Sequence, residues 1–344
     1  MLAQPIKRAV FSRRAAACLL SEGLAAGRAA RPLHQKAAAS LSLRGTQLQT
    51  ARQFFNFSTK ADALHLQIPA DIERPEYAED GEPAEAVSQQ PRIYDEEEIV
   101  RARFAGRLAR KMLDFANSLA VQPDKYTTDQ IDTLTREEIA KHRAYPSPLN
   151  YRGFPKSICT SVNEVVCHGI PNDRVVRKGD MVSIDISLYV DGFHGDNCGT
   201  VICGGEGDSD KDADAGRLIA ATQEALDMAV ALCRPGACIS DIGAAIDDVA
   251  KERGYAVVHE FCGHGTGELL HMPPFVRHFR NRFKVPMQPG MVFTIEPIFV
   301  ERSRRMTMWR DGWSAATMDG GRGAQFEHEV LITEEGFEVL TVPE

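Results

Sequence analysis

Residues 181–202 constrain the fold more than any other part of the sequence, because two strand-like runs flank a strong turn signal. In 181–190 the even-numbered positions are apolar, whereas Ser183, Asp185 and Ser187 share the opposite face. The dipeptide Asp191-Gly192 is one that two-residue hairpin turns favour. We therefore predict an antiparallel hairpin whose apolar face must pack against a second layer.

The predicted hairpin places two carboxylates on its polar face. We expect Val190 to pair with Phe193 across the turn. Asp196 then lies opposite Ser187, on the same face as Asp185 and diagonal to it, within side-chain reach. Two carboxylates this close repel each other unless a positive charge lies between them. Taken alone, the pattern fits either a divalent-metal site or a solvated polar strand face.

Four residues further along the chain have the type and setting of site residues. His264 is flanked by glycines, which let the backbone approach closely and leave the imidazole accessible, and His271 follows seven residues later. Glu296 ends one strongly apolar run, and Glu327 enters another. Each of the four alone is also compatible with a structural histidine or a salt bridge.

Charge and cysteine content exclude several classes of protein. The net charge is −8, but residues 1–60 hold ten of the 40 basic residues and one of the 48 acidic ones. The chain after residue 60 is therefore strongly acidic. A region with this charge is not expected to bind nucleic acid through phosphates. The eight cysteines form no CxxC pair, which indicates reduced thiols. No run of eighteen apolar residues is present, so we expect no membrane span.

The chain divides into three regions by composition. Residues 1–60 are rich in Ala, Arg, Ser and Leu and nearly free of acids, which is typical of an organelle transit peptide; a disordered basic tail is the alternative. We expect the mitochondrial matrix as its destination, with a plastid as the alternative. Residues 61–92 are acidic and contain four prolines, as in a linker or a surface-wrapping arm. Residues 93–344 have the pattern of a globular catalytic domain.

Helical and strand patterns are interleaved in the globular region. Asp95 is expected to cap the first helix, with acids in its first turn. Predicted helices cover 96–120, 128–142, 213–233 and 240–253, and a loop covers 203–215. Besides the hairpin, predicted strands cover 256–262, 291–300, 325–333 and 337–342. This arrangement indicates the α+β class and not a doubly wound sheet.

The order of these residues resembles the methionine aminopeptidases, which have the pita-bread fold of pseudo-two-fold antiparallel sheets flanked by helices. The resemblance rests on five residues and on the strings 155–171, 191–196 and 293–297, and it covers about residues 93–344. It implies a dinuclear site of Mn²⁺, Fe²⁺, Co²⁺ or Zn²⁺ that shares a hydroxide nucleophile. The implied metal ligands are Asp185, Asp196, His264, Glu296 and Glu327. In this family Asp196 and Glu327 would bridge both ions, and Glu296 would also act as general base.

The resemblance further implies substrate contacts. His271 would lie near the scissile carbonyl and His168 near the amine or the leaving nitrogen, so both join Glu296 as catalytic residues. The implied apolar methionine pocket consists of Tyr151, Phe154, Cys159, Leu270 and Trp313. Phe154 stands where many relatives carry tyrosine, and Leu270 stands where some carry phenylalanine. We therefore expect the shape of the pocket to differ from that of those relatives. A monovalent cation near Asn163 is also implied.

The subtype and the alternatives follow from what the sequence lacks. No large insertion separates His271 from Glu296, and no cysteine/histidine finger precedes residue 93, which favours an organellar type I enzyme. Such an enzyme would act as a monomer on peptide and protein N-termini beginning with Met and a small second residue. One alternative is a Xaa-Pro aminopeptidase of the same fold. The other is a non-catalytic binding module, which would purify without stoichiometric metal.

Overall fold

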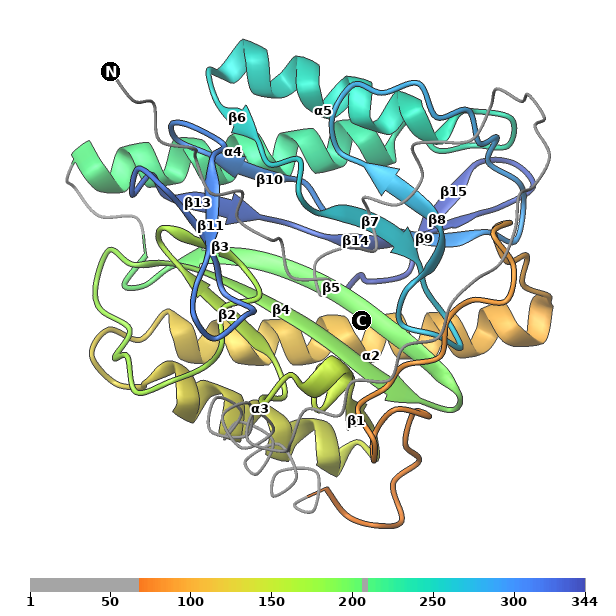
Figure 1. Ribbon diagram of the computed structural model, residues 1–344, viewed down its shortest axis with the longest axis horizontal. Coiled ribbons are helices and arrows are strands. Elements are labelled where there is room, and N and C mark those ends of the chain that lie inside the picture. The colour runs from red at the N-terminus through yellow and green to blue at the C-terminus, as the bar shows by residue number, and fades with distance from the viewer. Residues whose placement is uncertain (1–67, 206–209, 344) are drawn as a thin grey trace, which may run out of the picture. The chain divides into compact units, whose positions relative to one another are not determined.

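The computed structural model of the chain describes residues 68–205 and 210–343 (Figure 1). The predicted transit peptide at 1–60 lies outside the described residues, as do residues 61–67 of the predicted linker and 206–209 of the predicted loop.

Four long helices frame the described region: α2 (Glu96–Ala120), α3 (Thr128–Lys141), α4 (Asp210–Val230) and α5 (Ile239–Arg253). As predicted, Asp95 caps α2: its carboxylate accepts the Glu98 N–H while the Glu98 side chain accepts the Asp95 N–H. The predicted loop 203–215 is wrong at its end, because α4 already begins at residue 210. Within the described ranges, no helix is both long enough and apolar enough to cross a bilayer.

The predicted hairpin is confirmed in position and register. It consists of β4 (Met181–Val190) and β5 (Phe193–Ile202), with Val190 opposite Phe193 and Ser187 opposite Asp196. Two strands that the sequence analysis did not predict, β2 (Cys159–Val162) and β1 (Tyr145–Pro146), pair with β4 on its other edge.

A second antiparallel sheet carries the C-terminal half in the order β15-β14-β9-β7-β8. Its strands are β7 (Cys262–Gly265), β8 (Met272–Arg277), β9 (Val292–Ile295), β14 (His328–Ile332) and β15 (Phe337–Val339). Two three-stranded sheets consist of β6 (Ala256–Val257), β10 (Ile298–Val300) and β13 (Gly323–Gln325), and of β3 (Val165–Cys167), β11 (Met306–Met308) and β12 (Ala315–Thr317). Two predicted strands are each divided in two. The predicted strand 256–262 becomes β6 and the start of β7. The predicted strand 291–300 is interrupted at Glu296-Pro297, because proline lacks the N–H that a continuous ladder needs.

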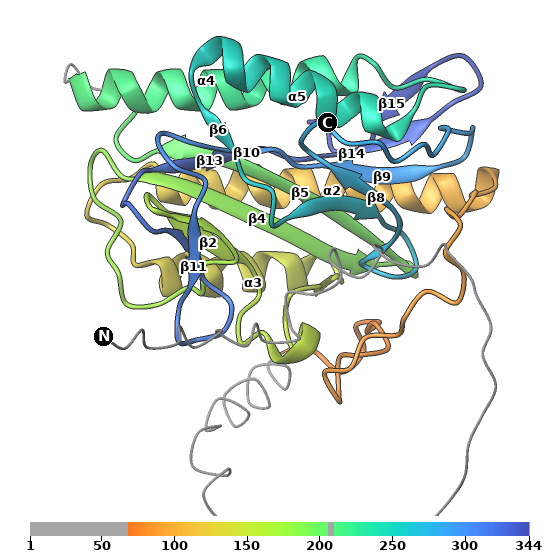
Figure 2. The ribbon, with the colours of Figure 1, turned by 45° about the horizontal axis from the view of Figure 1, so that its top comes forward.

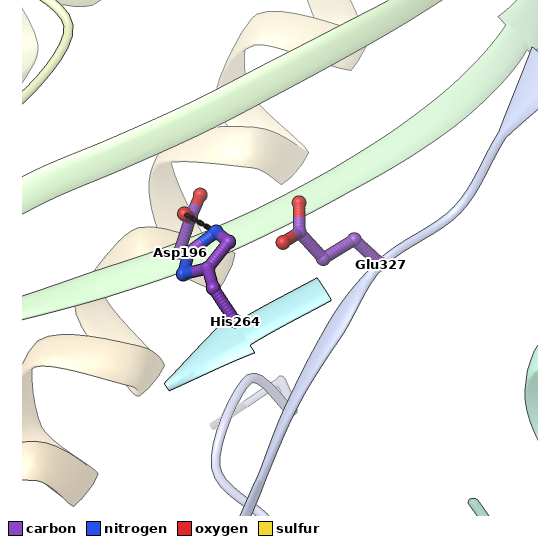
Figure 3. A group of neighbouring side chains, drawn as sticks. All are labelled: Asp196, His264 and Glu327. Carbon is purple, nitrogen blue, oxygen red and sulfur yellow. Dashed lines mark ion pairs between the residues drawn. The ribbon is translucent and has the colours of Figure 1, made fainter. Parts of the chain in front are cut away.

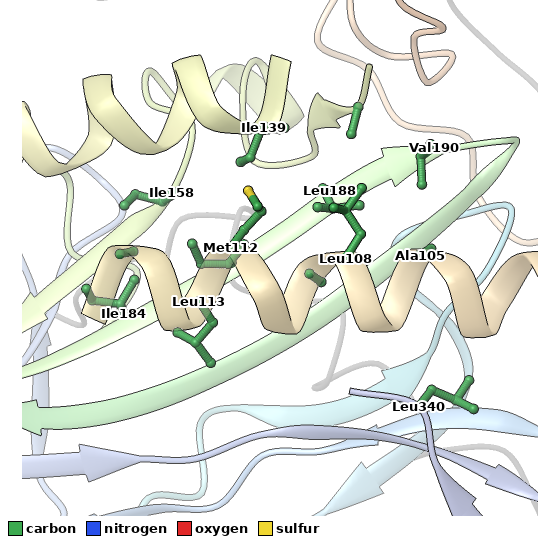
Figure 4. Packing of buried hydrophobic residues seen from close by; sticks show 14 of the residues in the cluster. Ala105, Leu108, Met112, Leu113, Ile139, Ile158, Ile184, Leu188, Val190 and Leu340 are labelled. Carbon is green, nitrogen blue, oxygen red and sulfur yellow. The ribbon is translucent and has the colours of Figure 1, made fainter. Parts of the chain in front are cut away.

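Helices α4 and α5 lie on one side of the set of sheets, and α2 and α3 lie on the other (Figures 1 and 2). The pair α4–α5 covers the second sheet, and α2 lies along the hairpin. Figure 4 shows Leu108 and Met112 of α2 beside Ile184 and Leu188 of β4. The apolar face of the hairpin is thus buried by α2, as its alternating pattern requires, and its polar face is left for the site.

Residues 68–81 lie against the body, and we call this segment the surface arm. Ile68, Ile72 and Ala78 are buried with Tyr145 and Leu149. The 3₁₀ turn η2 (Tyr151–Gly153) follows directly after this small cluster in the chain.

Candidate metal centre

The hairpin and the segment before β14 supply three carboxylates. Asp185 on β4 pairs with Cys198 on β5, and Cys198 forms an isolated bridge with Glu327, whose N–H donates to the Cys198 carbonyl at 2.9 Å. This bridge joins the two halves of the sequence at the polar face of the hairpin. Asp196 and Glu327 are both buried.

A histidine and a fourth carboxylate complete the group. Ligand atoms of Asp196, His264 and Glu327 lie within 4.8 Å of one another, and Figure 3 shows the three side chains reaching toward one another from β5, β7 and the segment before β14. His264 Nε2 is 3.7 Å from Asp196 Oδ2 and 3.6 Å from Glu296 Oε1. Two ligands bound at about 2.1 Å to one ion lie at most about 4.2 Å apart, so these separations suit a shared cation.

Burial and mutual repulsion raise the carboxylate pKa values. For Asp185 and Asp196 the main cause is removal from water, and the neighbouring charge of Asp185 adds to the rise at Asp196. For Glu327 the same burial is reinforced by the charges of Asp196, Glu296 and Asp185. Among the side chains described, those of 68–205 and 213–343, no lysine or arginine forms an ion pair with Asp185, Asp196 or Glu327. A divalent cation would supply the missing positive charge, so the donor set fits a metal.

The buried imidazole of His264 is neutral. Burial lowers its pKa to about 4, which keeps the imidazole uncharged at neutral pH. The Thr294 hydroxyl accepts the His264 N–H at 3.0 Å and donates to Glu296 Oε1 at 3.0 Å. The Glu296 N–H in turn donates to His278 Nε2 at 3.0 Å.

The other predicted site residues form two groups of contacts, one of which adjoins His264. His271 lies next to His264, with ring centroids 4.2 Å apart, and its Nδ1 is 2.7 Å from the Tyr151 hydroxyl. Trp313 contacts both His168 and Phe154 edge-to-face, with centroids 5.9 and 5.1 Å apart.

For the remaining predicted residues the structure gives the burial of the side chain or a single contact. Cys159 is buried on β2, opposite Asp185, and burial raises its pKa so that the thiol stays protonated. Leu270 is buried next to His271 in the chain. The Asn163 carbonyl accepts the Gly323 N–H at 2.9 Å, beside a surface hollow of about 990 Å³.

Sequence reasoning missed three residues of this region. Thr294 shares the strand face of Glu296 two positions away, so the alternation of β9 could have indicated it. Phe261 packs edge-to-face on His168 at 5.1 Å, and His278 supports Glu296. Neither carries a local signal, because each contact joins segments that are distant in the chain.

Comparison with known proteins agrees with this geometry. The model of metallopeptidase family M24 matches residues 101–334. The chain is 44% identical over 279 residues to "Methionine aminopeptidase 1D, mitochondrial" of Dictyostelium discoideum, covering 80% of this chain and 67% of that one. It is 43% identical to "Methionine aminopeptidase 1D, chloroplastic/mitochondrial" of Arabidopsis thaliana, covering 80% and 76%.

A solved structure extends the comparison to the fold. Methionine aminopeptidase from Rickettsia prowazekii superposes with a TM-score of 0.70 at 39% identity, over 74% of this chain and 100% of that one. The antiparallel sheets flanked by helices are therefore the pita-bread arrangement, and the predicted α+β class is confirmed. The chain belongs to metallopeptidase family M24, in the branch of the type I methionine aminopeptidases.

Proposed function

We propose that this aminopeptidase removes the N-terminal methionine from proteins and peptides whose second residue is small, at a dinuclear metal site. The convergence of four buried or half-buried carboxylates and one neutral imidazole, with no lysine or arginine paired to three of them in the described ranges, supports this most directly. Oxygen and imidazole donors without a thiolate suit Mn²⁺, Fe²⁺, Co²⁺ or Zn²⁺. The proposed ligands are Asp185, Asp196, His264, Glu296 and Glu327.

The metal pair would supply Lewis acidity and a nucleophile at neutral pH. Asp196 and Glu327 would both hold the metal, because their carboxylates come from different halves of the sequence and reach the same point. Glu296 would take a proton as general base, since its Oε1 is already oriented by the Thr294 hydroxyl. The oriented geometry matters because a misplaced base loses most of its effect.

The two non-ligand histidines would contact substrate. His271 adjoins His264 and is the exposed member of the group, so it can meet the scissile carbonyl. Burial lowers the pKa of His168 to about 4, so this imidazole would act in its neutral form on the amine or the leaving nitrogen.

Phe154 and Trp313, together with Tyr151, Cys159 and Leu270, would form the methionine pocket. A thioether packs well at aromatic edges, and the edge-to-face pair Phe154–Trp313 presents such a surface beside His168. Phenylalanine at position 154 keeps this wall without a hydroxyl group. A monovalent cation near Asn163 completes the proposed ion set.

The proposed setting is an organelle. The acid-poor composition of residues 1–60 and the printed mitochondrial and chloroplastic/mitochondrial names of similar enzymes support removal of an N-terminal transit segment, with the mitochondrial matrix as the destination and a plastid as the alternative. Residues 61–92 would join that segment to the catalytic domain 93–344. We propose that the enzyme acts as a monomer on polypeptide N-termini and does not bind nucleic acid.

The decisive experiment measures metal-dependent methionine release. Protein stripped with a chelator and resupplied with Mn²⁺ or Co²⁺ is given peptides headed by Met-Gly, Met-Ala, Met-Leu or Ala-Pro. We expect release from the first two only. Cleavage of the Ala-Pro peptide alone would move the assignment to the proline-specific relatives, and no cleavage with any metal would favour a binding module.

A further inference from the structure

The surface arm, residues 68–81, is firmly attached to the body although it precedes the segment matched by the family model. Its Ile68 and Ile72 are buried against Tyr145 and Leu149. Arg143 adds two bonds at 2.8 Å, one to the Asp71 carboxylate and one to the Asp71 carbonyl. The arm therefore has a defined position from which its other side chains can act.

Tyr77 is the arm's most deeply buried large side chain, with 1% of its surface exposed. Its hydroxyl donates to the Ser147 carbonyl at 2.7 Å. The ring meets Tyr151 edge-to-face, with centroids 5.0 Å apart and planes at 89°, and lies nearly parallel to His194 at 6.2 Å. Such edge-to-face packing holds an aromatic ring in one orientation.

The loop that carries Tyr151 needs support from outside itself. Asn150 and Arg152, on either side of Tyr151, have φ values of 64° and 49°, a region that side chains other than glycine rarely adopt. Such conformations persist when the surrounding structure holds them. The arm provides that support, because the Asn150 amide donates to the carbonyls of Ala78 at 3.1 Å and Glu79 at 3.3 Å.

Tyr151 connects the arm to His271. Its hydroxyl is 2.7 Å from His271 Nδ1, and the two rings lie 5.0 Å apart. A partner on Nδ1 selects the tautomer and leaves Nε2 for another contact. The His271 ring is 4.2 Å from that of His264, so a small rotation of His271 changes its position relative to the metal centre.

We propose that the arm is a working part of the active site and that Tyr77 is a positioning residue, which holds Tyr151 so that Tyr151 orients the His271 imidazole. This inference rests on the proposed function, which assigns His271 to the scissile carbonyl. The catalytic domain would then include residues that precede 101–334, the segment matched by the family model. The arm would act on His271 through the rings of Tyr77 and Tyr151.

The test is a double-mutant cycle in the full chain, with kcat and KM for a Met-Ala peptide. We expect Tyr77→Ala and Tyr151→Phe each to lower kcat about tenfold with KM changed less than about threefold, since small displacements of catalytic groups are costly. The double variant should be no slower than the slower single variant, and Tyr77→Phe should keep most of the activity because it retains the ring. Tyr126→Ala, a matched tyrosine truncation away from the arm, should keep wild-type kcat. Wild-type kcat in folded Tyr77→Ala, or a double variant slowed by the product of both effects, overturns the proposal.

A second readout does not depend on activity. Side-chain ¹⁵N spectra of the histidines in metal-free protein should show the His271 Nδ1 signal of Tyr77→Ala moving in the same direction as that of Tyr151→Phe. An unmoved signal overturns the proposal. If the wild-type protein releases no methionine, the proposed function fails, whereas these spectra still decide whether Tyr77 controls His271.

Discussion

Thr294 in β9 and Glu296, the residue that follows this strand, are joined by a hydrogen bond of 3.0 Å from the threonine hydroxyl to carboxylate Oε1. The same hydroxyl accepts the backbone N–H of His264 at 3.0 Å. The Thr294 side chain therefore links the Glu296 carboxylate to the backbone of the strand that carries His264.

Removal of this hydroxyl should weaken metal binding without unfolding the protein. We expect Thr294→Val, which keeps the shape of the side chain, to weaken Mn²⁺ binding by about 10–100-fold, as is usual when a partner of a metal ligand is lost. Thr294→Ser should bind almost as the wild type does. Calorimetric titration of chelator-treated protein measures both, and equal affinity in the valine variant would show that Glu296 needs no such support.

Asp196→Asn should abolish methionine release while the fold survives. The substitution keeps the volume of a buried side chain but removes one of the charges that a cation would balance. We expect bound metal, measured by atomic emission, to fall below the wild-type stoichiometry and activity to be lost. Asp191→Asn, at the exposed hairpin turn five residues earlier, is the matched control and should behave as the wild type does. Full activity in Asp196→Asn would be incompatible with the two-metal assignment.

Gly195→Ala should destabilise the protein because α2 crosses β5 at this glycine. A Cβ there would lie 2.3 Å from the Ala105 carbonyl oxygen, and backbone of a helix cannot move aside easily. We expect a loss of roughly 1–3 kcal/mol or more in the free energy of unfolding. Gly199→Ala on the same strand meets only side-chain atoms at 3.5 Å and should cost less than about 1 kcal/mol. Denaturant titration of the metal-free variants compares them, and equal losses would contradict the close crossing.

Acid should destabilise the protein partly through His278. Burial lowers its pKa to about 3, whereas the unfolded chain titrates near 6.5. Below pH 6.5 the unfolded state binds a proton that the folded state does not, so stability falls as the pH drops toward 3. From pH 7 to pH 5 this one residue should remove about 2 kcal/mol. His278→Gln should lose about that much less than the wild type over the same range, measured by denaturant titration of metal-free protein. An identical pH slope in the two proteins would contradict a neutral buried His278.

Much of the hairpin and the types of the site residues were accessible from the sequence. The register that sets Asp196 opposite Ser187 follows from a two-residue turn and a period of two, both of which are local. The capping box of Asp95 with Glu98 is local as well. The errors also have local causes: proline at 297 divides a strand, and an acidic stretch read as loop begins a helix at residue 210.

The tertiary structure alone decided which of these residues meet. The bridge between Cys198 and Glu327, the support of Glu296 by His278 and the packing of Tyr77 on Tyr151 all join segments that are far apart in the sequence. No periodicity or turn signal encodes such contacts, because they depend on how α2, the two sheets and the arm pack together. The sequence by itself determined the local geometry and the chemical types of these side chains; the packing of distant segments determined that they face one another.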